Sequence, residues 1–136
     1  MLFDRTDHEL GRLYQADEEI LAQGEEEVEN LYIILEGQVE VFAQDANGKT
    51  VRFSVLGEGE ILGELAALDG GPRCASARAM GKARILTIDR RGLLRRIQED
   101  PSLALRLLVQ MSRRIRLLDQ EVLRLHALGK GQEEGE

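Results

Sequence analysis

The fold is decided by residues 31–55, LYIILEGQVEVFAQDANGKTVRFSV. The stretch opens with a β-rich apolar run at 31–36, and apolar and polar residues then alternate at 39–43, as they do in a half-buried strand. An Asn-Gly dipeptide at 47–48, which is typical of a tight hairpin turn, precedes a second alternating run at 51–55. The stretch therefore predicts three strands, the last two of which form an antiparallel hairpin.

Short strands are also predicted on both sides of this stretch, and glycines punctuate the chain at intervals of about ten residues. The additional strands are expected at 18–22, 60–62, 74–80 and 84–89. Many short strands with regular turns are typical of an antiparallel sandwich or barrel, and not of a fold in which strands and helices alternate.

Helical patterns begin at Asp89, a suitable N-cap for a short helix. Asp100-Pro101 then supplies a second N-cap with proline at the first helical position. One long helix is expected to run from there to about Leu128, and Gly129 is expected to end it.

The length of 136 residues predicts a single domain, 1–136. We expect a mainly β fold with C-terminal helices. An antiparallel double-stranded β-helix (a jelly roll or β-roll) would occupy about 14–89, a short and a long helix about 90–128, and an acidic tail 129–136.

The long helix carries two sets of apolar residues spaced seven apart, which interleave as in a coiled coil. These residues are Leu108, Ile115 and Val122 in one set and Met111, Leu118 and Leu125 in the other. β-Branched residues at two of three a positions favour a parallel dimer, in which Arg114 of one chain faces Asp119 of the other. A second stripe offers the alternative that the helix packs on its own barrel; it consists of Leu103, Leu107 and Leu117. A helix with two stripes can do both, so a homodimer is expected.

The charges are unevenly distributed along the chain. With 18 Lys and Arg against 25 Asp and Glu, the net charge of −7 argues against a general nucleic-acid-binding protein. Residues 1–70 hold 17 acids and 4 bases, whereas residues 71–136 hold 8 acids and 14 bases. Anion recognition is therefore expected in the second half, although most of its arginines lie on the predicted helices and suggest a partner surface.

The single cysteine and the two histidines exclude several kinds of site. One Cys cannot form an internal disulfide, and His8 and His126 lie at opposite ends of the sequence. No metal site, catalytic residue or cofactor is expected. The lone thiol suits a reducing compartment, and neither a membrane-spanning run nor a signal pattern is found, so a soluble cytoplasmic protein is expected.

Residues 63–77, GELAALDGGPRCASA, carry the candidate chemistry. Gly63 permits a close approach of the backbone, and residues 64–68 favour a helix of only one or two turns. Amides at the start of such a helix can bind an anion, to which Arg73 would add a charged fork. Glu64 could accept hydrogen bonds from sugar hydroxyls. The segment suggests a site for a compact nucleotide; the plain alternative is a turn followed by a surface arginine.

The same segment resembles the phosphate-binding cassette of the cyclic nucleotide-binding domain family, whose pattern is Gly-Glu-aliphatic-Ala, a short loop, and Pro-Arg-x-Ala-Ser/Thr. The matching residues are Gly63, Glu64, Leu65, Ala66, Pro72, Arg73, Ala75 and Ser76. The resemblance extends over about residues 14–128, and it includes Gln23-Gly24-Glu25, the run at 31–34, and residues 110–114. The chain is therefore identified as a member of this family.

The resemblance implies roles for individual residues. Glu64 would bind the ribose 2′-hydroxyl and Arg73 an exocyclic phosphate oxygen. Backbone groups would complete the phosphate cradle near Gly63, Leu65, Cys74 and Ala75. The ligand is expected to be a cyclic nucleotide, cAMP rather than cGMP.

Three residues depart from the family pattern. Cys74 stands where many members carry Ser, Thr or Ala, so a side-chain contact to phosphate is expected to be missing. We expect a small buried residue there; the alternative is a redox switch beside Arg73. On the long helix, Leu118 and Asp119 occupy positions from which some members present hydroxyls to adenine. Leu118 cannot make that bond, whereas Asp119 could accept a hydrogen bond from adenine or guanine.

These inferences predict a stand-alone regulatory sensor that signals through its C-terminal helix to an unknown protein effector. The alternative is a non-binding dimerisation or scaffold protein that retains the fold, against which the intact Glu64 and Arg73 argue. An enzyme on a β-roll would need clustered His and Glu ligands. A transcription factor would need a helix-turn-helix after the long helix. Neither is found, so we expect no enzymatic domain and no DNA or membrane partner.

Overall fold

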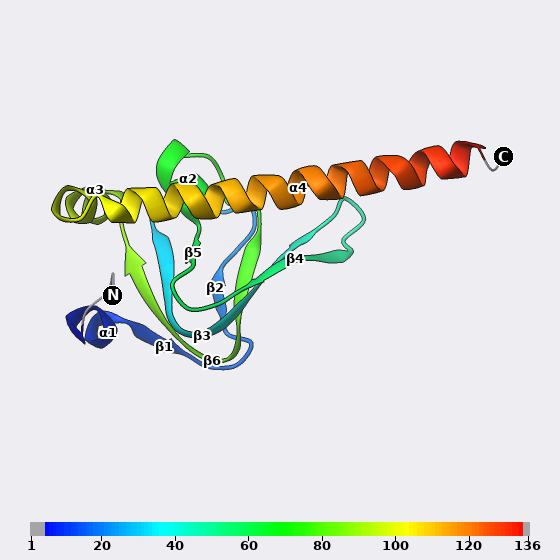
Figure 1. Cartoon of the computed structure of the whole chain (residues 1–136). Helices are drawn as coiled ribbons and strands as arrows, with labels where there is room; N and C mark the ends of the chain where they lie inside the picture. Colours follow the sequence, from blue (N-terminus) through cyan, green and yellow to red (C-terminus); the bar gives the residue numbers. More distant parts are fainter. Residues whose placement is uncertain (1–4, 135–136) are drawn as a thin grey trace. The chain divides into compact units, whose positions relative to one another are not determined.

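The structure is a computed structural model that describes residues 5–134, with side chains for residue 7 and residues 9–129. Figure 1 labels its elements in chain order: α1 (Arg5–Leu10), β1 (Arg12–Tyr14), β2 (Glu19–Leu21), β3 (Leu31–Gln44), β4 (Thr50–Leu56), β5 (Ile61–Leu62), α2 (Glu64–Asp69), β6 (Ser76–Ile88), α3 (Arg90–Glu99) and α4 (Ser102–Glu134). The chain divides into two compact units, Met1–Asp100 and Pro101–Glu136. Each unit is described by itself.

β3 and β6 form the centre of a six-stranded antiparallel sheet in the first unit (Figure 1). The strand order is β1-β6-β3-β4, with β2 paired to β6 and β5 paired to β3. The register of the central pair runs from Leu31 opposite Ile88 to Phe42 opposite Ser76. The predicted antiparallel β-fold followed by C-terminal helices is thus confirmed.

The two central strands are longer than predicted. The runs at 31–36 and 39–43 belong to one strand, β3, which bends at Gly37 where the register with β6 shifts. Gly37 has a φ of +90°, and a Cβ there would lie 2.5 Å from the carbonyl oxygen of Lys82. Glycine therefore lets the strand bend while its pairing with β6 continues. A glycine inside a strand pattern can thus mark a bend in one strand as well as a turn between two strands. The strands predicted at 74–80 and 84–89 are joined in the same way as β6.

The predicted hairpin between β3 and β4 is confirmed. Its turn is held by the side chain of Asp45, whose Oδ1 accepts hydrogen bonds from the N–H groups of Asn47 and Lys49, both at 2.9 Å. β4 lies at the edge of the sheet, and its alternating residues Val51 and Phe53 are exposed. The alternating pattern at 51–55 therefore predicted the strand correctly, but it did not predict that the apolar side chains of the strand are exposed.

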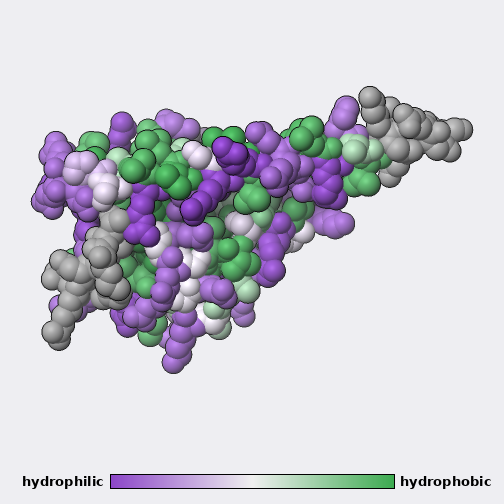
Figure 2. All heavy atoms as spheres, in the orientation of Figure 1, coloured by the Kyte–Doolittle hydropathy of each residue, from purple (hydrophilic) through white to green (hydrophobic). Residues whose placement is uncertain are grey.

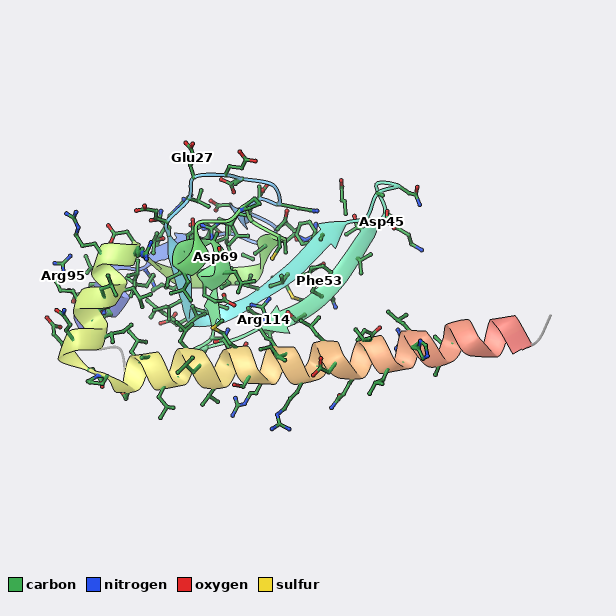
Figure 3. The ribbon with its side chains drawn as sticks, turned by 90° about the horizontal axis from the view of Figure 1, so that it is seen from above. Glu27, Asp45, Phe53, Asp69, Arg95 and Arg114 are labelled. Atoms are coloured by element: carbon green, nitrogen blue, oxygen red, sulfur yellow. The ribbon has the colours of Figure 1, made fainter. Side chains whose placement is uncertain are left out.

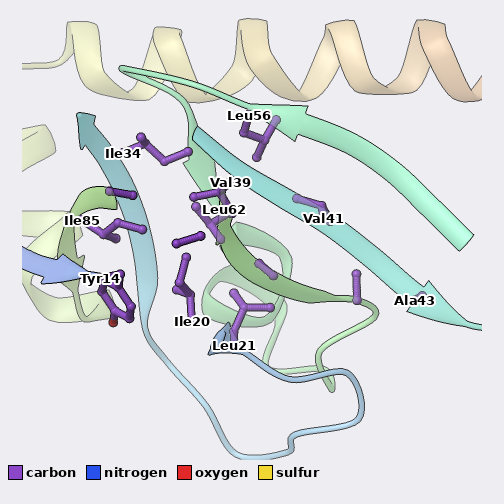
Figure 4. Close-up of a cluster of buried hydrophobic side chains, with 14 residues drawn as sticks. Tyr14, Ile20, Leu21, Ile34, Val39, Val41, Ala43, Leu56, Leu62 and Ile85 are labelled. Atoms are coloured by element: carbon purple, nitrogen blue, oxygen red, sulfur yellow. The ribbon is translucent and has the colours of Figure 1, made fainter. Parts of the chain in front are cut away.

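The core of the first unit is aliphatic, as a chain with three Phe, two Tyr and no Trp requires. Figure 4 shows the main cluster, in which apolar side chains from all six strands meet. Its larger members are Tyr14, Ile20, Leu21, Ile34, Val39, Val41, Leu56, Leu62 and Ile85. Burial of these side chains is the main force that holds the strands which carry the site.

The N-terminal part of the first unit was not predicted. The β-structure begins at Arg12 and not at about residue 14. The prediction missed α1 and β1 because both are too short to show a periodic pattern.

Helix α3 begins as predicted. Oδ1 of Asp89 accepts a hydrogen bond from the N–H of Gly92 at 2.6 Å, so Asp89 is its N-cap. Asp100 ends α3, because its N–H donates to the carbonyl oxygen of Arg96, and α4 begins at Ser102.

The predicted end of the long helix was wrong. α4 continues through Gly129 to Glu134, so the helices are not confined to 90–128. Of the expected tail at 129–136, the last two residues lie outside the described part. Gly129 does not have the left-handed φ that ends a helix. A glycine inside a helix costs only about 1 kcal/mol, and Lys, Gln and Glu neighbours favour the helix.

α4 displays apolar side chains along its length, seen as green residues between purple ones in Figure 2. The exposed residues include five of the six heptad positions, namely Leu108, Ile115, Leu118, Val122 and Leu125. In the part of the chain that the structure describes, no helix is long and apolar enough to cross a membrane.

Candidate functional site

The segment between β5 and β6 begins at Gly63, whose backbone needs a glycine. Its φ of +77° is left-handed, and a Cβ there would lie 2.5 Å from Nη1 of Arg73. Gly63 thus opens α2 and leaves room for the arginine. No side chain caps α2, so the N–H groups of its first turn receive no side-chain acceptor. The sequence prediction of a very short helix followed by a turn is confirmed.

Arg73 reaches from the far end of this segment back to its start. Its side chain is only 5% exposed. Nη1 donates to the carbonyl oxygen of Gly63 at 2.9 Å, and Nη2 donates to that of Asn30 at 2.7 Å. Nε is buried and has no hydrogen-bond partner, and no carboxylate forms an ion pair with Arg73 among the described residues. A buried cation held only by neutral groups is costly unless an anion joins it.

The ring of Tyr32 in β3 lies beside the guanidinium of Arg73. The guanidinium carbon lies 5.6 Å from the centroid of its ring, within the range of a cation–π contact. Burial raises the pKa of the Tyr32 hydroxyl, and the positive charge of Arg73 partly offsets that rise. The phenol therefore remains a neutral neighbour of the cation near neutral pH.

The backbone of Arg73 is anchored to the loop that precedes β3. Its N–H donates to the carbonyl oxygen of Glu25 at 2.9 Å, and its carbonyl accepts from the N–H of Gly24 at 2.8 Å. Three residues after Arg73, at the start of β6, the hydroxyl of Ser76 accepts a hydrogen bond from the N–H of Gln23 at 2.8 Å. The Gln-Gly-Glu sequence at 23–25 therefore holds the arginine segment in place.

Glu64 is the first residue of α2 and is only 1% exposed. Its Oε2 atom is buried, and the residue takes part in an interaction within the structure. A carboxylate oxygen can accept a hydrogen bond from a hydroxyl group. Arg73 thus contacts Gly63, the residue that precedes Glu64, at the start of α2, and the roles predicted for these residues stay predictions.

The remaining cassette residues differ in exposure. Ala66 and Ala75 are buried, whereas Leu65 is exposed. Cys74 is also exposed, so the expectation of a small buried residue at this position was wrong. Arg73 and Ala75 on either side of it are buried, and side chains alternate between faces along an extended segment, so Cys74 faces the other way.

Leu118 and Asp119 lie on α4, in the second unit, and both are exposed. Their proximity to the cassette therefore stays a prediction.

Sequence reasoning missed two contributors to the site, Asn30 and Tyr32. Asn30 acts through its backbone carbonyl, for which no residue type is a signal. Tyr32 was assigned to an apolar strand, although a polar-tipped residue between two buried aliphatic ones often has a specific contact. Among the residues that the structure describes, no group of His, Cys, Asp and Glu is placed to hold a metal ion.

Comparisons with known proteins bear on this site. A model of the family described as cyclic nucleotide-binding domain matches residues 11–100. The chain is 33% identical over 110 residues to the cAMP-activated global transcriptional regulator CRP of Escherichia coli O6:H1, a match that covers 80% of this chain and 52% of that protein. It is 34% identical over 111 residues to the Cyclic AMP receptor protein of Thermus thermophilus, covering 82% of this chain and 51% of that one.

A solved structure resembles the chain to a similar degree. The crystal structure of the Thermus thermophilus Catabolite Activator Protein matches with a TM-score of 0.76 and 32% identity, covering 89% of this chain and 57% of that chain. The chain spans about half the length of the curated relatives it matches.

Proposed function

Because the chain belongs to the cyclic nucleotide-binding domain family, we propose that it binds a cyclic nucleotide, cAMP in preference to cGMP, and acts as a regulatory protein and not as an enzyme. The preference for cAMP is supported by relatives whose names describe them as cAMP-activated or as cyclic AMP receptors. In this proposal the nucleotide is the signal, and its binding favours one conformation of the protein over another.

The observation that carries the proposal is the state of Arg73. Its guanidinium is buried, its Nε has no hydrogen-bond partner, and its other contacts are two carbonyl oxygens and a tyrosine ring. The cyclic phosphate of the ligand carries one negative charge and has two exocyclic oxygens. One of them would receive the Nε–H bond and neutralise the buried charge, which is a charge-assisted bond of the strong kind.

The other cassette residues would complete the contacts. The backbone amides at Gly63, Leu65, Cys74 and Ala75 would face the phosphate, with the small side chain of Ala66 leaving room behind them. Glu64 would accept a hydrogen bond from the ribose 2′-hydroxyl, a group that distinguishes cyclic ribonucleotides from deoxy analogues. Leu118 and Asp119 of α4 would contact the base, where Asp119 could accept from an amino group.

The test is calorimetric titration of cAMP and cGMP into the protein and two variants. Arg73→Ala should weaken cAMP binding by about 2–5 kcal/mol, the usual effect of truncating one partner of a buried charged contact. Because this change also removes the hydrogen bonds to the carbonyls of Gly63 and Asn30, Glu64→Gln provides a near-isosteric second variant, expected to lose about 1.5–3 kcal/mol. Lys49→Ala, which removes an exposed charge from the hairpin turn, is the matched control and should bind as the wild type does.

The outcomes separate binding from scaffolding. If the wild-type protein shows no heat of binding and no rise in melting temperature with cAMP or cGMP, the protein is a non-binding member of the family. Tighter binding of cGMP would keep the site but reverse the proposed preference.

We further propose a homodimer formed through α4. The exposed heptad residues of α4 provide an apolar stripe of the kind that two parallel helices bury. Sedimentation should show a dimer that Ile115→Glu converts to a monomer, whereas Leu117→Glu, equally exposed but outside the heptad positions, should leave it dimeric. Equal behaviour of the two variants would contradict this geometry. The signal would then pass through the helices to a protein effector.

A further inference from the structure

We propose that the outer face of α3 is a docking surface for an acidic, amphipathic segment of a partner protein. This surface, the α3 basic face, consists of Arg90, Arg91, Leu94 and Arg95. The proposal goes beyond nucleotide binding and does not depend on it.

Helical spacing places these four residues on one side of α3. Arg90 and Leu94 are four residues apart, as are Arg91 and Arg95, so the arginines surround the leucine. All four are exposed, and Leu94 is 55% exposed although Leu93 beside it is buried. Figure 3 shows Arg95 pointing away from the sheet of its unit.

The three arginines differ from the other described arginines of the first unit. Each of the others has a polar partner: Arg12 with Glu18, Arg52 and Arg78 with Glu40, Arg73 with two carbonyls, Arg84 with the carbonyl of Gly11, and Arg96 with Asp7. Within the described residues, the side chains of Arg90, Arg91 and Arg95 form no hydrogen bond and no ion pair. Arg96, on the same helix, shows that a guanidinium in α3 does pair where a carboxylate is near, at 2.8 Å.

Stability of the helix does not explain these arginines. Arg90 and Arg91 lie in the first turn, where the helix dipole disfavours cations, and no acidic residue occupies that turn. Arg91 and Arg95 are like charges four residues apart, which also disfavours the helix. In a chain of net charge −7, α3 holds four arginines and one glutamate. An anion bound by these arginines would offset both the repulsion between their charges and the unfavourable effect of the helix dipole.

Protein carboxylates fit this face better than phosphates do. Arginine forks bind carboxylates and phosphates alike as bidentate partners, but arginine is enriched in protein interfaces. An exposed leucine at the centre of the face calls for an apolar partner, which a sugar-phosphate backbone does not provide.

The test measures fluorescence anisotropy of a labelled peptide in which Glu and Leu repeat at helical spacing. A second peptide replaces each Leu with Ser, and single-stranded DNA and vesicles containing phosphatidylserine are the other probes. The variant is Arg91→Glu with Arg95→Glu. The change at residue 91 places an acid in the first turn of α3, which favours the helix, and circular dichroism checks that the variant stays folded. The matched control is Lys49→Glu with Lys82→Glu, which makes the same charge change on exposed residues of the same unit.

We expect the Glu-Leu peptide to bind the wild type and the lysine control alike, and the arginine variant at least about tenfold more weakly. Leu94→Ser should weaken the Glu-Leu peptide and not its Ser counterpart. Equal loss in both charge variants, or no binding of the peptide to the wild type, would overturn the proposal. DNA or vesicles that bind more tightly than the peptide through the same arginines would assign the face to phosphate and overturn it as well. A cAMP-dependent rise in melting temperature that persists in the arginine variant would show that this variant loses peptide binding without losing nucleotide binding.

Discussion

Gly63 and Gly70, the two glycines that flank α2, provide a sharp test of how the cassette is built. Both have a left-handed φ, +77° and +74°. A Cβ on Gly70 would meet nothing within 4 Å, whereas a Cβ on Gly63 would lie 2.5 Å from Nη1 and 3.3 Å from Cζ of Arg73. Replacing each with alanine therefore imposes the same backbone strain at both ends of the helix but a steric clash at only one.

The expected magnitudes follow from these contacts. A left-handed alanine costs about 1–2 kcal/mol, which is the whole effect expected for Gly70→Ala. In Gly63→Ala the guanidinium must also move, and it loses its hydrogen bond to the carbonyl oxygen of Gly63, worth about 1.5–3 kcal/mol for a charged donor. The gain from restricting the unfolded chain is the same for both changes and cancels in the comparison. Gly63→Ala should thus be the more destabilising by about 1.5–3 kcal/mol.

Urea unfolding followed by tyrosine fluorescence measures this difference. The chain has no Trp, and both of its Tyr residues, Tyr14 and Tyr32, lie in the first unit, so the signal reports on the unit that holds the cassette. Calorimetry on the same variants should show that cAMP affinity falls by at least about tenfold in Gly63→Ala and is unchanged in Gly70→Ala. Equal destabilisation together with equal affinity would refute the placement of Arg73 against Gly63.

Three further changes test other parts of the molecule. Hydrogen bonds from Arg52, and next from Arg78, lower the pKa of Glu40, so this carboxylate stabilises the fold at neutral pH and its contribution is lost as the pH falls below about 4.3. Glu40→Gln should therefore lower the melting temperature at neutral pH, and the melting temperatures of variant and wild type should converge in acid. A difference in melting temperature that stays the same at every pH would contradict this reasoning. Cys74, being exposed, should react with iodoacetamide in the folded protein, and saturating cAMP should slow the reaction; an unchanged rate would place the thiol away from the ligand. Asp89→Ala should cost about 1 kcal/mol in urea unfolding and Asp89→Asn only a few tenths, because Asn also caps helices; equal losses would argue against the cap.

The turn and cap residues were predictable because each depends on a local backbone preference. The Asn-Gly turn at 47–48 and the N-cap at Asp89 lie where the residue types indicated. The errors arose where a local signal has two meanings. Gly37 bends a strand that continues, and Gly129 lies inside a helix that continues, because pairing with β6 in one case and helix-favouring neighbours in the other outweigh the cost of glycine.

The exposure of side chains was less predictable than the elements that carry them. Phe53 alternates correctly in β4 but is 55% exposed, because β4 is an edge strand of the sheet. Cys74 was expected to be buried and faces outward. In both cases burial depends on what lies across from the residue, and the local pattern does not contain that information.

The sequence by itself determined the family, the strand-rich first part and the spacing between Glu64 and Arg73, since these are properties of neighbouring residues along the chain. Only the tertiary structure decided that Arg73 is buried, that it contacts the carbonyls of Gly63 and Asn30, and that its Nε is left without a partner. The physical reason is that Asn30 lies 43 residues away in sequence, and the sheet brings it beside Arg73 through contacts that no local preference encodes.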